Sequence, residues 1–298
     1  MTPLGIGIVG LGYWGKKYLI TLQMLNRDYS LTVFAADRND LLLSDWDQPT
    51  VYMSYNEMLM RPEIKAIIVA TPDETHYQIA CQALKSSKDV LVEKPMALGV
   101  SEAEEMVHLA ESTGRILATG HTAIYTEGFL SLCARLSALS PTLGKIVRVK
   151  AFRTSRGRKS GNCLWDLAPH DIAMAITLFG EPVDGECRLL TPSKAVYELV
   201  FSNGELFSGN VEWNSPPFRR EFKIIGENGE LSIDNTAPSR EFRSSPLARQ
   251  CEDFIFCCRT RRRPQSDGVM GLKVVRCLEM LTRKIPSPRG FRTVCSFQ

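Results

Sequence analysis

Apolar residues in the first part of the chain fall into short runs, separated by longer segments in which apolar positions repeat at helical spacing. Runs that are apolar on both faces are typical of parallel strands covered by helices on each side. The alternation of strand and helix also favours right-handed crossovers within one sheet. We therefore predict a doubly wound parallel α/β unit with strands at residues 4–10, 31–36, 66–70, 90–92 and 115–120. Helices are expected at residues 16–25, 53–60, 73–85 and 101–111, the last opening on a Ser101–Glu104 capping box.

The pattern changes after residue 122, where apolar and polar residues begin to alternate along strands. Asn203-Gly204 and Asn228-Gly229 are strong hairpin signals, so we expect an open, mostly antiparallel sheet in an α+β unit. The boundary is placed at residue 121, giving domains 1–121 and 122–298. Strands are expected at 145–153, 195–202, 205–213, 219–225 and 230–234, and helices at 127–139, 172–179 and 268–283.

A glycine-rich turn follows the first strand. Gly10, Gly12 and Gly15 form G-x-G-x-x-G between a strand and a helix, with Tyr13 and Trp14 in the variable positions. In this context the first glycine makes a tight turn, the second lets the backbone approach a pyrophosphate, and the third allows close helix–strand packing. The pattern predicts a dinucleotide-binding Rossmann domain.

The second strand ends in Asp37 and Arg38. An acid at this position accepts hydrogen bonds from the adenosine ribose hydroxyls and repels a 2′-phosphate, which favours NAD. The neighbouring guanidinium of Arg38 could instead pair with the phosphate of NADP. NAD is the predicted cofactor, with NADP as the alternative.

Polar residues end three later strands of the predicted parallel sheet. Thr71, Lys94 and His121 should meet at the carboxyl edge, where open α/β sheets bind their ligands. Lys94 lies between Glu93 and Pro95, and the proline disfavours helical geometry at the lysine. The ammonium is therefore expected to point into the site, the alternative being a solvated Lys-Pro turn.

Asp166 and His170 lie four residues apart, before an apolar helix in which Pro169 suits the first turn. A carboxylate beside an imidazole can move a proton near neutral pH. The alternative reading is structural, with Asp166 capping the helix and His170 buried in the core.

Composition removes several other classes of function. The chain has 298 residues, and a net charge of +3 is too small to indicate nucleic acid or an anionic membrane as a partner. Its apolar runs are shorter than the roughly 20 residues that cross a bilayer. The first strand follows the N-terminus closely, and the cysteines lack zinc-type spacing, so we expect a cytoplasmic protein without a metal. The basic run Arg259–Arg263 reads as a solvated helix end.

Taken together, the glycine turn, Ala70-Thr71-Pro72, Glu93-Lys94-Pro95, Asp166-x-x-x-His170 and the closing Asp267-Gly268 helix resemble the glucose–fructose oxidoreductase / inositol 2-dehydrogenase / MocA family. The resemblance implies an NAD(P)-dependent dehydrogenase acting on a secondary alcohol of a sugar, nucleotide-linked sugar or cyclitol. It assigns the catalytic roles to Lys94, Asp166 and His170. The segment Trp165–Ile172 looks most like the branch acting on nucleotide-linked sugars.

The remaining site residues divide by expected role. Residues expected to contact the cofactor are Gly10, Gly12, Tyr13, Trp14, Gly15, Asp37, Arg38, Thr71, Pro72, His76, Glu93 and Lys94. Candidate substrate contacts are His121, Tyr125 and Arg153. The resemblance also implies a homo-oligomer, a dimer or tetramer, assembled through the outer face of the second sheet, where we expect Phe207 and Trp213.

Two other functions fit parts of the pattern. One is a reductase of an imine or a tetrapyrrole on the same scaffold. The other is a non-catalytic NAD(P)-binding regulator. The presence of Lys94, Asp166 and His170 together favours the dehydrogenase over both.

Overall fold

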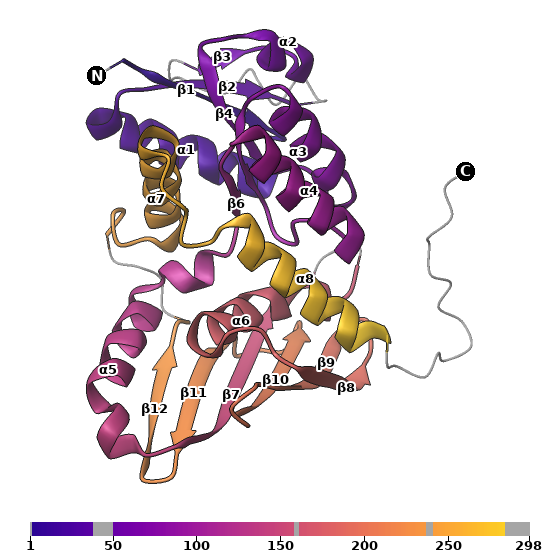
Figure 1. The fold of residues 1–298 in the computed structure, drawn as a ribbon, viewed down its shortest axis with the longest axis vertical. Coiled ribbons are helices and arrows are strands. Elements are labelled where there is room, and N and C mark those ends of the chain that lie inside the picture. Colours follow the sequence, from indigo (N-terminus) through magenta and orange to yellow (C-terminus); the bar gives the residue numbers. More distant parts are fainter. Residues whose placement is uncertain (1, 38–49, 158–160, 237–240, 284–298) are drawn as a thin grey trace.

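The computed structural model describes residues 2–37, 50–157, 161–236 and 241–283. Two six-stranded sheets lie one above the other, each with helices packed against it (Figure 1). The first sheet is parallel throughout, and the second is mostly antiparallel. This architecture confirms the predicted α/β unit followed by an α+β unit. None of the helices in the described part of the chain is long and apolar enough to span a membrane.

The first sheet has the strand order β3-β2-β1-β4-β5-β6. The order in which the strands follow along the chain therefore reverses between β1 and β4, and open sheets of this kind bind dinucleotides at that point. Helices α1 and α7 cover one face, and α3 and α4 cover the other. Its strands are β1 (Leu4–Val9), β2 (Leu31–Ala36), β3 (Thr50–Tyr52), β4 (Ile64–Val69), β5 (Asp89–Val92) and β6 (Leu117–Thr119). Its helices are α1 (Tyr13–Tyr29), α2 (Tyr55–Met60), η2 (Asp73–Thr75), α3 (His76–Lys85) and α4 (Val100–Thr113).

The second sheet has the order β12-β11-β7-β10-β9-β8, with β7 and β10 parallel in its centre. Its apolar face packs against α6, and α8 lies between the two sheets with residues in both cores. The strands are β7 (Ile146–Ser155), β8 (Asp184–Leu190), β9 (Lys194–Val200), β10 (Leu206–Trp213), β11 (Arg220–Gly226) and β12 (Gly229–Asp234). The helices are η3 (Thr122–Tyr125), α5 (Glu127–Leu143), α6 (Cys163–Phe179), α7 (Pro246–Thr260) and α8 (Gly268–Arg283).

The hydrophobic pattern did not predict β3 and β8. Each of these strands lies at one edge of its sheet. Edge strands have no neighbour on one side, and most residues of β8 are exposed or half-buried. Neither strand therefore carries the apolar run that marks a buried one. Both missed strands lie at sheet edges, and the predicted strands that carry the site residues are all present.

Helix starts were predicted less well. α6 begins at Cys163, where the Asn162 side chain accepts a hydrogen bond from the Trp165 amide, so Pro169 lies inside the helix rather than in its first turn. A proline inside a helix lacks the N–H for one intrahelical hydrogen bond. In α6 the packing of the helix in the hydrophobic core compensates for that loss. The expected capping box at Ser101 is also wrong, because α4 is preceded by Gly99 without a side-chain cap.

Phe207 and Trp213 face inward, which contradicts their expected place on the outer face. Both are buried in the core between the second sheet and α6. The alternate positions of β10 carry Ser208, Asn210 and Glu212, which are polar. The predicted apolar subunit contact therefore loses its stated basis, and the homo-oligomer stays a prediction.

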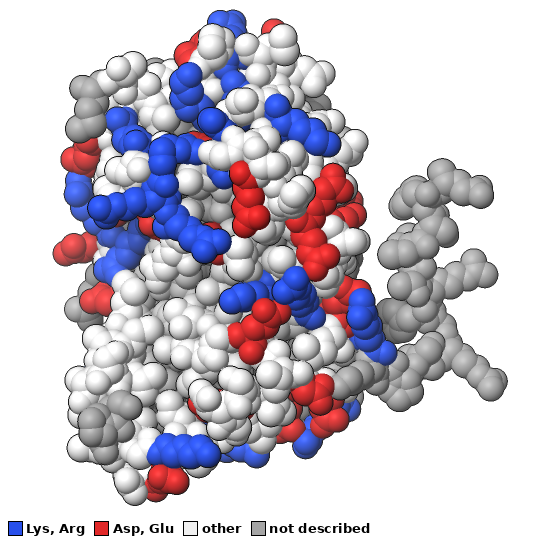
Figure 2. All heavy atoms as spheres, in the orientation of Figure 1, with Lys and Arg blue, Asp and Glu red and all other residues white. Residues whose placement is uncertain are grey.

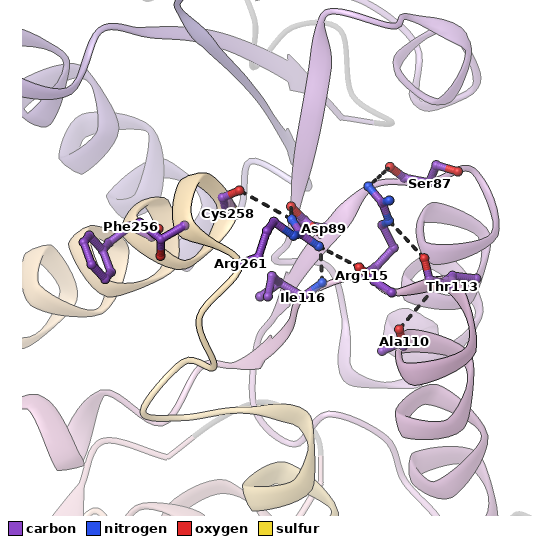
Figure 3. A network of polar contacts seen from close by, with 11 residues as sticks. Ser87, Asp89, Ala110, Thr113, Arg115, Ile116, Phe256, Cys258 and Arg261 are labelled. Carbon is purple, nitrogen blue, oxygen red and sulfur yellow. Dashed lines mark hydrogen bonds and ion pairs between the residues drawn. The ribbon is translucent and has the colours of Figure 1, made fainter. Parts of the chain in front are cut away.

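The C-terminal helices return to the first unit. Residues of α7 pack in the core of the first sheet, although the predicted domain boundary lies far upstream. Arg261 follows α7 and donates from Nη1 to Asp89 Oδ2 at 2.6 Å and from Nη2 to the Gly114 carbonyl at 2.7 Å (Figure 3). Asp89 in turn accepts from the Ile116 amide at 2.9 Å, so this contact ties α7 to β5 and β6.

Lysine and arginine side chains gather over α7 and the adjoining part of α1 (Figure 2). The basic run after α7 is not simply solvated, as the sequence suggested. Arg259 Nη2 donates to the Tyr29 carbonyl at 2.6 Å, and Arg261 pairs with the buried Asp89. These contacts satisfy backbone and carboxylate groups of the first unit, which gives the run a structural role.

Candidate active site

A cleft of about 1470 Å³ opens between the two sheets at the carboxyl ends of β1, β4 and β5. The second unit closes its other side with residues from β7, β11 and α6. Twelve of the residues predicted to form the site line it: Gly10, Gly12, Tyr13, Trp14, Asp37, Thr71, Pro72, Glu93, Lys94, Arg153, Asp166 and His170. Arg38 lies outside the described residues.

The glycine turn has the shape that a pyrophosphate needs. Gly10 adopts φ +89°, and a Cβ on Gly15 would lie 1.8 Å from the Gly10 carbonyl oxygen, so neither position accepts a side chain. A Cβ on Gly12 would meet nothing within 4 Å, because that position faces the open cleft. The start of α1 beyond it supplies unpaired amide groups for phosphate oxygens. The residues present therefore fit a dinucleotide.

Asp37 sits at the end of β2, directly beside this turn. Its Oδ2 accepts a hydrogen bond from the Leu11 amide at 2.5 Å, so the carboxylate is held at the mouth of the glycine turn. Across the turn, Lys17 lies over the rings of Tyr13 and Trp14, at 4.3 Å and 4.9 Å from their centroids. These side chains form the cofactor end of the cleft.

His76 is fully buried and does not line the cleft, contrary to its expected contact with the cofactor. Its Nδ1 lies 2.8 Å from the Pro95 carbonyl oxygen, and its Nε2 lies 2.9 Å from that of Thr71. The imidazole thus links the two loops that carry Thr71 and Lys94. We assign it a positioning role instead.

Lys94 is held by the second unit. Its Nζ donates to Asp166 Oδ1 at 2.9 Å and to the Asp166 carbonyl at 2.7 Å. The other carboxylate oxygen, Oδ2, accepts from Trp213 Nε1 at 3.0 Å. An ammonium has three donors, so one N–H of Lys94 is left without a partner among the described residues. Trp213 had no sequence signal as a site residue, because its role depends on β10 lying beside α6.

Glu93 precedes Lys94 and accepts a hydrogen bond from the Lys94 backbone amide. Tyr18 donates to Glu93 Oε1 at 2.7 Å, and Gln250 Nε2 donates to the Tyr18 hydroxyl at 2.8 Å. Burial raises the pKa of the Glu93 carboxyl above its usual value. These hydrogen bonds join α7, α1 and the end of β5, so they hold Glu93, the residue before Lys94, in place.

His170 lines the cleft one helical turn beyond Asp166. It makes no hydrogen bond with the described residues, since the contacts of Asp166 reach Lys94 and Trp213 instead. Burial lowers the pKa of His170 well below its usual value, and the charges of Arg153 and Lys94 lower it further. The imidazole is therefore neutral at pH 7 and can accept a proton.

Two of the three candidate substrate contacts do not line the cleft. His121 is 1% exposed, and neither ring nitrogen is hydrogen-bonded to a described residue; burial together with the Lys94 charge lowers its pKa to about 3. Tyr125 is also buried, donating to Asp253 Oδ2 at 2.7 Å and accepting from the Ser266 amide at 3.2 Å. Both residues belong to the junction between the units and are not substrate contacts in this arrangement.

Arg153 does line the cleft, from β7. Its Nε and Nη2 donate to Asp171 Oδ1 at 3.0 Å and 2.6 Å. Sequence reasoning missed Arg220, which lines the same wall from β11. Its only available signal was its position at the start of a predicted strand, which does not separate it from the neighbouring Arg219.

Comparison with known proteins agrees with this geometry. Residues 4–121 match the model of an oxidoreductase family with an NAD-binding Rossmann fold. The uncharacterized oxidoreductase YdgJ of Escherichia coli is 33% identical over 189 residues, which cover 60% of this chain and 54% of that protein. Myo-inositol 2-dehydrogenase of Thermotoga maritima is 28% identical over 77% of this chain and 75% of its own length.

A solved structure shares the whole architecture. GenD2 from gentamicin A biosynthesis, crystallised in complex with NAD, superposes with a TM-score of 0.83 at 22% identity, over 95% of this chain and 94% of that one. Fold, glycine turn and cleft together define an NAD-binding oxidoreductase. Residues 4–121 match the glucose–fructose oxidoreductase / inositol 2-dehydrogenase / MocA family, and inositol 2-dehydrogenases are among the relatives that resemble a longer part of the chain.

Proposed function

We propose that this protein is an NAD(H)-dependent dehydrogenase that acts on a secondary alcohol, or the matching ketone, of a sugar, nucleotide-linked sugar or cyclitol. The observation that carries the proposal is that Lys94 and His170 come from different units and line one cleft beside the glycine turn. In this proposal residues 1–121 hold the cofactor, and residues 122–298 supply Asp166, His170 and Arg153.

The nicotinamide, when bound, supplies the hydride acceptor for oxidation and the hydride donor for reduction. Lys94 uses its remaining N–H to hydrogen-bond the reacting oxygen and stabilises the negative charge that develops there. His170 accepts the hydroxyl proton during oxidation and returns it during reduction. Asp166 and Trp213 hold the ammonium in place, so Asp166 positions Lys94 rather than the imidazole.

The residues at the cofactor end of the cleft predict which of NAD(H) and NADP(H) binds more tightly. Gly10, Gly12 and Gly15 would hold the pyrophosphate, and Asp37 would accept hydrogen bonds from the adenosine ribose. We expect NAD(H) to bind more tightly than NADP(H), and Asp37→Ala to narrow that gap by roughly 10–100-fold, the range for losing a hydrogen bond to a charged group. Fluorescence titration with NADH and NADPH measures both affinities.

Two further variants test the cause of this preference. Asp37→Asn keeps an acceptor for the Leu11 amide but removes the charge. This variant therefore distinguishes the contribution of Asp37 to the shape of the glycine turn from its contribution to binding the ribose. Asp73→Ala removes another carboxylate that lines the cleft and should leave the preference unchanged. Tighter binding of NADPH by the intact protein would show that Asp37 does not select the cofactor.

A substrate screen tests the reaction class. NADH formation or consumption is followed by its fluorescence with cyclitols, free sugars, UDP-linked sugars, cyclic imines and linear tetrapyrroles. Turnover of an alcohol or ketone in the first three groups supports the proposal. Turnover of an imine or a tetrapyrrole alone would assign the chain to the alternative reductase, and tight NADH binding without any turnover would favour a regulator.

Location and assembly stay predictions. We infer a cytoplasmic homo-oligomer from the sequence resemblance, with a small-molecule substrate and neither nucleic acid nor a membrane as partner. Light scattering at micromolar concentration tests the assembly directly, and a monomer would contradict it.

A further inference from the structure

Two arginines lie directly opposite each other at the edge of the cleft. Arg153 of β7 and Arg220 of β11 are partners in the antiparallel register, so both side chains leave the same face of the sheet. Like charges in this position destabilise a sheet. Such a pair is explained most simply by an anion that binds between or beside the two guanidinium groups.

The protein supplies only part of that negative charge. Asp171 on α6 is buried, and its Oδ1 accepts hydrogen bonds from both Nε and Nη2 of Arg153. That contact fixes the guanidinium plane and leaves Nη1 without a partner among the described residues. The side chain of Arg220 has neither an ion pair nor a hydrogen bond with any residue in the described ranges, although its backbone bonds Thr236 and Asn235.

Both arginines also lie at the reacting end of the cleft. Each lines it together with Lys94 and His170. Their charges contribute to the lowered pKa of His170, and Tyr13 of the glycine turn lines the same cleft. Arg220 therefore borders the same cleft as the imidazole and the glycine turn.

We propose that Arg220, with Arg153 held by Asp171, binds an oxyanion of the substrate, so that the substrate is a sugar or cyclitol derivative carrying a phosphate, diphosphate or carboxylate. A guanidinium matches the planar, two-oxygen geometry of each of these groups. This inference rests on the proposed function, because it takes the cleft as the substrate site. It narrows that function by excluding uncharged cyclitols and free neutral sugars as the preferred substrates.

Anion binding is measured by isothermal titration calorimetry on the full chain saturated with NADH, so that the glycine turn is already occupied. The probes are inorganic phosphate, inorganic pyrophosphate and glucuronate, which stand for a sugar phosphate, a nucleotide-linked sugar and a sugar acid. We expect at least one to bind, and Arg220→Gln to weaken it by about 10–100-fold, the range for losing a charged hydrogen bond. The probe that binds most tightly identifies the source of the oxyanion.

Arg219→Gln is the matched control. Arg219 is the preceding residue and carries the same charge, but its guanidinium lies over the Phe152 ring at 5.4 Å and it is not among the cleft-lining residues. We expect this variant to bind the anion as the unmodified protein does. Arg220→Lys, which keeps the charge but loses the two-pronged geometry, should retain part of the affinity.

The inference is overturned if none of the three anions binds, or if Arg220→Gln and Arg219→Gln weaken binding equally. It is also overturned if Arg220→Gln raises the Kd of NADH, because the arginine would then serve the cofactor. Turnover of myo-inositol that is unaffected by Arg220→Gln, without anion binding, would remove this inference and leave the proposed dehydrogenase intact. If anions bind in an Arg220-dependent manner but the substrate screen gives no turnover, the opposite conclusion follows. The oxyanion site is then supported, and the proposed dehydrogenase function is rejected.

Discussion

Replacing Lys94 by alanine is expected to lower kcat by roughly 10²–10³, the scale for removing one donor to a developing oxyanion. Its Nζ is held by Asp166 at 2.9 Å with one N–H left for a ligand, so the variant removes the positioned donor itself. The Kd of NADH should change little, because the phosphates are held at the glycine turn. Steady-state rates with the best substrate of the screen, together with NADH titration, measure both effects.

Lys88 provides a matched control at the opposite end of β5. It is 5% exposed and donates from Nζ to the carbonyls of Arg61 and Ile64 at 2.7 Å and 2.8 Å, just before β5 begins. Lys94 follows the opposite, carboxyl end of β5, which is where such sheets bind ligands. Lys88→Ala should lower the melting temperature while folded molecules keep their rate. Equal rates for the two variants, corrected for the folded fraction, would reject the role given to Lys94.

His170→Ala is expected to lower kcat by roughly 10²–10⁴, the range for losing general acid–base catalysis. Burial and the charges of Arg153, Lys94 and Arg220 lower the pKa of this imidazole. The neutral, proton-accepting form therefore persists below the ordinary histidine pKa. The rate of alcohol oxidation should stay level as the pH falls through 6.5 and decline only at lower pH, when His170 becomes protonated. This acid limb should be absent from the residual activity of the variant.

His121→Ala separates catalysis from packing. Neither imidazole makes a hydrogen bond with the described residues, but His121 is buried whereas His170 is half-buried and lines the cleft. We expect His121→Ala to lower the melting temperature and to retain more of kcat than His170→Ala. If the two variants lose stability alike and folded His170→Ala enzyme keeps its rate and its acid limb, His170 is a core residue and another group carries the proton.

Local sequence patterns were sufficient for the parts of this protein that local forces determine. The glycine turn, the Asn-Gly hairpins and the buried parallel strands were predicted because each depends on backbone geometry or on period-two burial within a few residues. The carboxyl edge of the first sheet was predicted for the same reason, and it correctly brought Thr71 and Lys94 to the cleft. Among the strands in the described part of the chain, β3 and β8 gave no such signal, because β3 has three residues and most of β8 is exposed or half-buried.

Tertiary packing decided the rest of the site. Docking of the two units joined Lys94 to Asp166 rather than Asp166 to His170, and packing within the second unit brought Trp213 to the same carboxylate. Docking also buried His121 and Tyr125 at the junction, and strand pairing within the second sheet placed Arg220 opposite Arg153 on the cleft wall. These contacts join residues far apart in the chain, and they depend on how α6 packs between the sheets. Helical spacing or strand alternation fixes which way a side chain leaves its own element, but not which partner it meets there.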